Sequence, residues 1–145
     1  MGWRTLSEEQ AATLPEARLG GALLWIVAAA FVLCLISLLG SALAFERLHA
    51  IGLRYAIAVS FVTAWSIAFL AMTAVRWRHT PTVASAGLLL WIAWRTAVVV
   101  ASSPYELWPL LVDLAAEWVL AAGFCGYMAT AVRPNAYYRR RLPVP

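Results

Sequence analysis

Four long apolar runs constrain this chain more than any other feature. A membrane-spanning helix needs about 20 consecutive, mostly apolar residues, and four stretches meet that requirement, at residues 19–45, 55–75, 83–101 and 108–132. Charged residues make up 12% of the chain, against about 25% in a typical soluble domain. The sequence therefore predicts an all-α polytopic membrane protein and excludes both a soluble enzyme and a disordered chain.

The connections between the runs are short, so consecutive helices are expected to be antiparallel neighbours in a four-helix bundle. The domain plan is a cytoplasmic N-terminal segment at 1–18, the transmembrane domain at 19–132 and a basic cytoplasmic tail at 133–145. A capping-box pattern at Ser7 and Gln10 predicts a short interfacial helix near the N-terminus. The first run is too long, and its flank too acidic, for a cleaved signal peptide.

The arginines predict the orientation. All eleven basic residues are arginine, and cytoplasmic loops of membrane proteins carry the excess of basic residues. In the four-span arrangement, two fall on one side, Arg47 and Arg54, and one, Arg95, lies inside a span. The other eight fall on the opposite side: Arg4, Arg18, Arg76, Arg78, Arg133, Arg139, Arg140 and Arg141. We therefore expect both termini of this multi-pass protein to be cytoplasmic.

Aromatic and basic residues near the ends of the spans are candidate membrane anchors. Trp and Tyr are enriched where the hydrocarbon meets the headgroups, and arginine binds anionic lipid there. The candidates are Trp77, Trp108, Tyr137, Tyr138, Arg139, Arg140 and Arg141. Anchoring to membrane lipid is the preferred interpretation, and docking to a partner is the alternative.

Three ionisable residues interrupt the apolar spans. Each costs about 2.5–3.5 kcal/mol near a helix centre, so such residues are candidates for function or for helix pairing. Counting from the connection between the third and fourth spans places Arg95 and Asp113 at equal depth, with Glu117 one helical turn deeper. Arg95 can therefore reach either acid. The cluster is either an ion pair that locks two helices or a proton or cation site in which Glu117 titrates.

Tryptophans surround these charges. Trp91 and Trp94 flank Arg95 in the sequence, and Trp118 follows Glu117. They could stack on a flat apolar ligand such as a quinone or a pigment, although packing against neighbouring helices or lipid is the preferred interpretation. No cofactor is otherwise indicated.

Several other functions are excluded. His49 and His79 fall on opposite sides of the membrane, about 30 Å apart, so they cannot ligate one haem within one chain. Cys34 and Cys125 lie inside apolar runs without metal-ligand spacing. No basic stripe interleaved with aromatics predicts nucleic-acid binding. No catalytic triad, zinc motif or phosphate-binding loop is present, so we expect no enzymatic activity.

Short motifs resemble those of the YdgK-like family of four-span bacterial inner-membrane proteins, a domain of unknown function. They are residues 18–24, the loop at 76–81, Tyr127 and the closing segment at 131–138. Ala22 stands where that family often has tryptophan, and Ala131 and Pro134 replace serine and valine in the closing motif. The resemblance implies four spans in the bacterial inner membrane. It implies no reaction and no catalytic residues.

Three functions fit these observations. The first is a non-catalytic accessory or assembly subunit of a larger inner-membrane complex, respiratory or photosynthetic, that binds other membrane-protein subunits. The second is a small, homo-oligomeric proton-coupled transporter that uses Arg95, Asp113 and Glu117. The third is a membrane protein that binds a quinone or pigment. The small size of this tryptophan-rich, four-span protein favours the first function, that of an accessory subunit.

Overall fold

Helices form nearly all of the regular structure. The computed structural model describes residues 2–43, 53–102 and 107–144. In chain order the elements are β1 (Trp3–Thr5), α1 (Glu8–Thr13), the 3₁₀ turn η1 (Pro15–Ala17), α2 (Gly21–Leu43), α4 (Leu53–Ala74), α5 (Thr80–Ser102), α6 (Leu107–Thr130), α7 (Val132–Arg139) and β2 (Arg141–Pro143). The capping box forms as predicted, because Ser7 and Gln10 exchange side-chain-to-backbone hydrogen bonds at the start of α1.

Four of these helices are long and apolar enough to cross a membrane. They contain 22 to 24 residues each, which at 1.5 Å per residue gives roughly 33–36 Å, enough for a hydrocarbon core of about 30 Å. Large apolar side chains point outward from them, including Trp25, Ile36, Leu90 and Leu120. Such an apolar exterior is typical of a protein whose solvent is lipid, which confirms the predicted membrane class.

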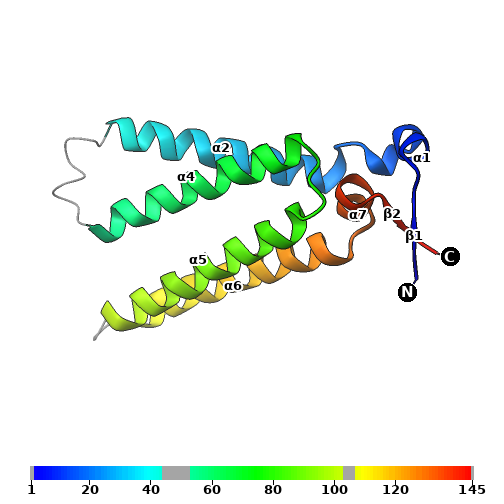
Figure 1. The fold of residues 1–145 in the computed structure, drawn as a ribbon. Coiled ribbons are helices and arrows are strands. Elements are labelled where there is room, and N and C mark those ends of the chain that lie inside the picture. The colour runs from blue at the N-terminus through cyan, green and yellow to red at the C-terminus, as the bar shows by residue number, and fades with distance from the viewer. Residues whose placement is uncertain (1, 44–52, 103–106, 145) are drawn as a thin grey trace.

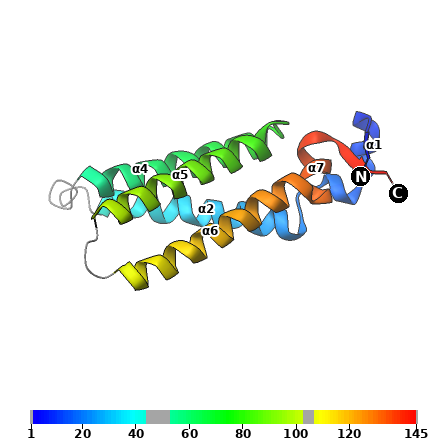
Figure 2. The ribbon, with the colours of Figure 1, turned by 90° about the horizontal axis from the view of Figure 1, so that it is seen from below.

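The four long helices are arranged as two pairs. α2 lies beside α4, and α5 lies beside α6, while α4 and α5 join the pairs. In Figure 1 the pairs come together near α7 and lie farther apart toward the opposite end. Figure 2 shows the four long helices running along one common direction, away from the α7 end. Both termini lie at the α7 end (Figure 1).

Close contact between α4 and α5 depends on Gly87. The Trp65 indole lies against this glycine and donates a hydrogen bond from Nε1 to the Ala84 carbonyl, 3.2 Å away. A Cβ at position 87 would lie 2.8 Å from Trp65 Cδ1. Since Trp65 also stacks on Phe69, with ring centroids 5.5 Å apart, the indole has little freedom to move away.

We expect Gly87→Ala to lower the free energy of unfolding by about 1–3 kcal/mol, the usual cost of overpacking. The matched control is Gly123→Ala on α6, where an added Cβ meets no atom within 4 Å. That change should be neutral or should stabilise the helix by up to about 1 kcal/mol. Reversible denaturation in mixed micelles measures both values. Equal stability of the two variants would contradict the packing described above.

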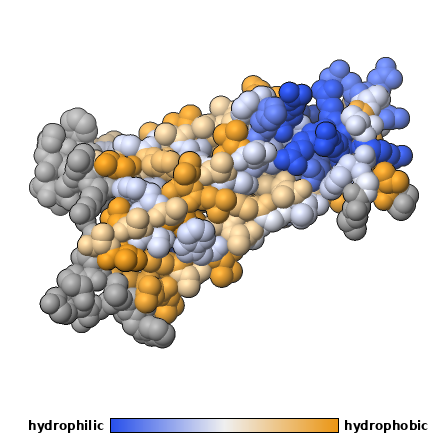
Figure 3. All heavy atoms as spheres, turned by 60° about the horizontal axis from the view of Figure 1, so that its bottom comes forward, coloured by the Kyte–Doolittle hydropathy of each residue, from blue (hydrophilic) through white to orange (hydrophobic). Residues whose placement is uncertain are grey.

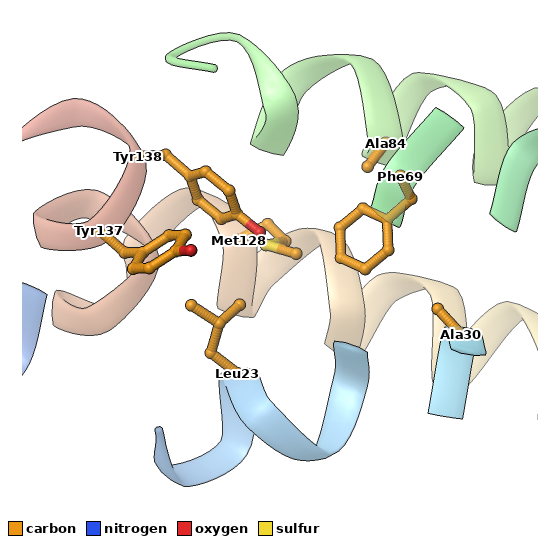
Figure 4. Close-up of a cluster of buried hydrophobic side chains, with 7 residues drawn as sticks. All are labelled: Leu23, Ala30, Phe69, Ala84, Met128, Tyr137 and Tyr138. Atoms are coloured by element: carbon orange, nitrogen blue, oxygen red, sulfur yellow. The ribbon is translucent and has the colours of Figure 1, made fainter. Parts of the chain in front are cut away.

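A buried cluster ties the helix pairs together at the α7 end. Figure 4 shows its members, which come from all four long helices and from α7: Leu23, Ala30, Phe69, Ala84, Met128, Tyr137 and Tyr138. Tyr137 donates from its hydroxyl to the Thr73 carbonyl at 3.2 Å, and Tyr138 shares a 2.8 Å hydrogen bond with the Thr73 hydroxyl. The short helix α7 therefore packs across this end of the four long helices and closes it.

This packing corrects the expected role of two residues. The sequence suggested that Tyr137 and Tyr138 anchor the tail among lipid headgroups, yet their side chains are buried within the protein. The physical reason is the turn after α6. There Asn135 donates from Nδ2 to the carbonyls of Ala129 and Ala131, which stabilises the break between α6 and α7 and folds the tail back under the helices.

The two terminal segments also pair with each other, which the sequence did not predict. β1 and β2 form a two-stranded antiparallel ribbon in which Trp3 faces Pro143 and Thr5 faces Arg141. On the face shown in Figure 3, hydrophilic residues gather at one end of the molecule and hydrophobic residues predominate over the rest. Residues 2–18 and 132–144 thus form a polar end of the molecule, which we call the polar cap, beside four apolar helices.

Candidate functional site

The three charged residues of the spans form one cluster between α5 and α6. Arg95 Nη2 lies 3.2 Å from Asp113 Oδ2, and Arg95 Nη1 lies 2.7 Å from Glu117 Oε1. The two acids are one helical turn apart on α6, so both point toward the same guanidinium. The sequence predicted that Arg95 could reach either acid, and in the structure it contacts both acids at once.

The cluster is unbalanced in charge and open at the side of the protein. With all three groups ionised it carries one excess negative charge. The Asp113 side chain is 65% exposed, against 37% for Arg95 and 23% for Glu117. Glu117 Oε2 is buried and has no hydrogen-bond partner among the residues described. The Asp113 carboxylate, by contrast, is accessible to a group outside the chain.

A cleft of about 420 Å³ begins at this cluster. It runs between the two helix pairs, with α2 on one side and α6 on the other. Arg95 and Glu117 lie at the end that faces the α5–α6 connection, and the Trp65 and Phe124 rings close the other end. Apolar residues form most of the walls, among them Ile26, Ala29, Ala30, Leu33, Leu120 and Ala121. The site is therefore an apolar cleft with a charged end.

The three candidate stacking residues are not brought onto one surface. Trp91 lines the cleft and stacks on Phe61 of α4, with ring centroids 5.1 Å apart. Trp94 packs against Trp91 outside the cleft lining. Trp118 donates from Nε1 to the Thr96 hydroxyl at 3.1 Å and so joins α6 to α5. Packing between helices accounts for most of this aromatic surface.

The remaining anchor candidates occupy the polar end or lie outside the described residues. Trp77 is exposed in the turn between α4 and α5 and contacts the His79 ring edge-to-face. Arg140 pairs with Glu8 at 2.8 Å, and Arg139 donates to Asn135 Oδ1 at 3.1 Å. Arg141 is exposed on β2. The side chain of Trp108, like all of His49, lies outside the described part of the chain.

The sequence reasoning missed the α2 wall of the cleft. Ala29, Ala30 and Leu33 look like ordinary apolar residues of a span, and nothing in their spacing predicts a cleft between two helix pairs. It also missed the proximity of Arg78 to Arg139 and Arg141 at the polar end. The three arginines line one cavity only because α7 folds back. The sequence around Asn135 gives no clear signal of that fold-back.

Two segments that carry the family resemblance meet in space. The Arg133 side chain crosses the start of α2, where a Cβ at Gly20 would lie 2.8 Å from Arg133 Nη1. Gly21 has a φ of +55°, which glycine adopts without steric cost. Glycines at both positions therefore let the C-terminal segment pack on the first span.

Searches of protein-family models, curated proteins and solved structures find no match to this chain. The resemblance to the YdgK-like family stays a prediction. The described residues 2–43, 53–102 and 107–144 contain no group of three His, Cys, Asp or Glu side chains placed to hold a metal ion. The charged cluster and its cleft form the candidate functional site.

Proposed function

We propose that this protein is a non-catalytic accessory or assembly subunit of a larger membrane complex. In this proposal its four helices are antiparallel spans of the bacterial inner membrane, and both termini are cytoplasmic. The eight arginines on the terminal side, against two on the other, support the orientation. The shared location of the termini and the polar cap fits the same arrangement (Figures 1 and 3).

The observation that carries the proposal is the unbalanced charge on an open lateral face. Lipid cannot neutralise the excess negative charge of the Arg95–Asp113–Glu117 cluster, and exposing an ion to hydrocarbon is costly. A partner transmembrane helix with one arginine or lysine at matching depth supplies the missing charge. Its basic group would bond to the Asp113 carboxylate, whose side chain is 65% exposed.

The cleft provides the apolar half of such an interface. Alanines at positions 29, 30 and 121 leave room for the side chains of an approaching helix, and small residues favour close helix packing in membranes. Leu120 borders the cleft and is 73% exposed. A helix seated between α2 and α6 would therefore cover exposed apolar surface while its basic residue meets the charged end.

Site-specific photo-crosslinking in the native membrane tests this proposal. We expect a crosslinking residue at Leu120 to capture a membrane protein whose adjacent span carries a basic residue. The same residue at Leu90 is the control, because Leu90 is 68% exposed on α5 and does not line the cleft. The Leu120 adduct should disappear in Glu117→Gln. Equal adducts at both positions, or an adduct that survives Glu117→Gln, would refute the proposed docking face.

The cleft also favours a second candidate function, binding of an amphipathic ligand such as a quinone. Its dimensions, the Trp91 wall and the charged end suit a flat apolar molecule with polar oxygens. Organic extraction of the purified protein separates the candidates. A stoichiometric quinone or pigment supports ligand binding, and an extract that contains only bulk lipid supports the docking proposal.

A further inference from the structure

A second cavity lies at the polar cap, at the opposite end of the helices from Arg95. It has a volume of about 400 Å³. β1, the α4–α5 turn, α5, α7 and β2 all contribute to its lining, which consists of Thr5, Arg78, His79, Thr82, Arg139 and Arg141. The cavity therefore exists only because the two termini pair and α7 folds back.

Three arginines line this cavity, and none of the described acidic residues does. Arg78 uses Nε to donate to His79 Nε2 at 2.9 Å, which leaves both of its terminal nitrogens available. Arg139 is oriented by hydrogen bonds to Asn135 Oδ1 and to the Thr82 hydroxyl, at 3.1 and 3.3 Å. The Arg140–Glu8 pair of the same cap lies outside the cavity.

This chemistry points to an anion with several oxygen atoms. Three guanidinium groups around one cavity repel each other unless a negative charge lies between them. The planar fork of arginine matches phosphate oxygens in pairs, and the hydroxyls of Thr5 and Thr82 add donors. We propose that this cavity binds a phosphate group, carried either by an anionic lipid headgroup or by a soluble phosphate compound. The proposal is independent of the docking function.

The test uses the full-length protein in a neutral detergent, where no charged bilayer surface attracts basic residues non-specifically. Native mass spectrometry compares binding of phosphatidylglycerol with that of phosphatidylcholine, and inorganic phosphate or glycerol phosphate is added as a competitor. The site variant is Arg78→Gln with Arg141→Gln. Arg139 is kept, because it also bonds Asn135 within the fold.

The matched control is Arg4→Gln with Arg18→Gln. It removes the same charge from the same cap, yet neither residue lines the cavity. Thr5 points into the cavity from β1, and side chains alternate along a strand, so the neighbouring Arg4 points elsewhere. We expect the site variant to bind phosphatidylglycerol about tenfold more weakly, since charge-assisted hydrogen bonds are lost, while the control changes little.

The competitors identify the source of the phosphate. Displacement of the lipid by inorganic phosphate at millimolar concentration supports recognition of the phosphate group alone. Failure of both soluble competitors, with lipid binding still dependent on the site arginines, supports a lipid headgroup. Equal weakening in the site variant and the control would overturn the proposal, and so would equal binding of the two lipids without any binding of soluble phosphate.

Discussion

Replacing Arg95 by leucine should lower the free energy of unfolding by about 3 kcal/mol. The change leaves Asp113 and Glu117 one turn apart, without the cation that each now contacts, at 3.2 and 2.7 Å. Removing one partner of a buried ion pair costs about 3–5 kcal/mol, and the lower end applies because the Arg95 side chain is 37% exposed. Denaturation in mixed micelles, followed by tryptophan fluorescence, measures the loss.

The control is the triple variant in which Arg95, Asp113 and Glu117 all become leucine. Replacing a whole ionic cluster with apolar side chains is often neutral or stabilising, because no charge is left unpaired. We therefore expect the triple variant to be within about 1 kcal/mol of wild type or more stable. If the triple variant is as unstable as Arg95→Leu, the loss comes from packing around position 95 and the charge argument is wrong.

Replacing Tyr138 by alanine should destabilise the protein by about 3–4 kcal/mol, typical of removing a buried aromatic ring. In Figure 4 the ring extends from α7 toward Met128 within the cluster, and the residue is 3% exposed. Losing it should release α7 from the end of α4. We expect a large fall in thermal midpoint together with rapid proteolysis after Arg139. A stable variant with a protected tail would contradict the role of α7 in closing this end of the four long helices.

Tyr138→Phe measures the contribution of the hydroxyl to stability separately from that of the ring. The variant keeps the packing and loses the 2.8 Å hydrogen bond to Thr73, so its free energy of unfolding should fall by about 1 kcal/mol.

Burial raises the pKa of Tyr138 to about 12, and the hydrogen bond to Thr73 opposes part of that rise. Because the unfolded chain releases this proton near pH 10, the wild-type free energy of unfolding should fall between pH 10 and 12. In Tyr138→Phe this fall should be smaller.

The apolar runs and the charge cluster were predictable because both depend on local rules. Span length follows from bilayer thickness. Equal depth across a short connection follows from the helical rise, so the approach of Arg95 to Asp113 and Glu117 could be anticipated from counting. The observed helix boundaries differ by a few residues from the predicted span boundaries. α5 begins at Thr80 rather than at 83, because Pro81 fits the first turn of a helix.

The polar cap and the cleft could not be predicted, because each depends on contacts between distant segments. Tyr137 and Tyr138 carry the sequence pattern of interface anchors, and only the turn at Asn135 directs them into the core. The pairing of Trp3 with Pro143 joins opposite ends of the chain. The cleft depends on how the α2–α4 pair meets the α5–α6 pair, and no single span encodes that geometry.

The most direct test of the docking account is native mass analysis of the tagged protein extracted from its own membrane in mild detergent. The wild type is compared with Glu117→Gln and with Thr130→Ala, a control on the same helix whose hydroxyl bonds only to the Gly126 carbonyl among the described residues. We predict that the wild type and Thr130→Ala carry a stoichiometric partner subunit with a basic residue in one span, and that Glu117→Gln does not. A wild-type protein that runs alone or as a homo-oligomer, or a partner retained by Glu117→Gln, would contradict the account.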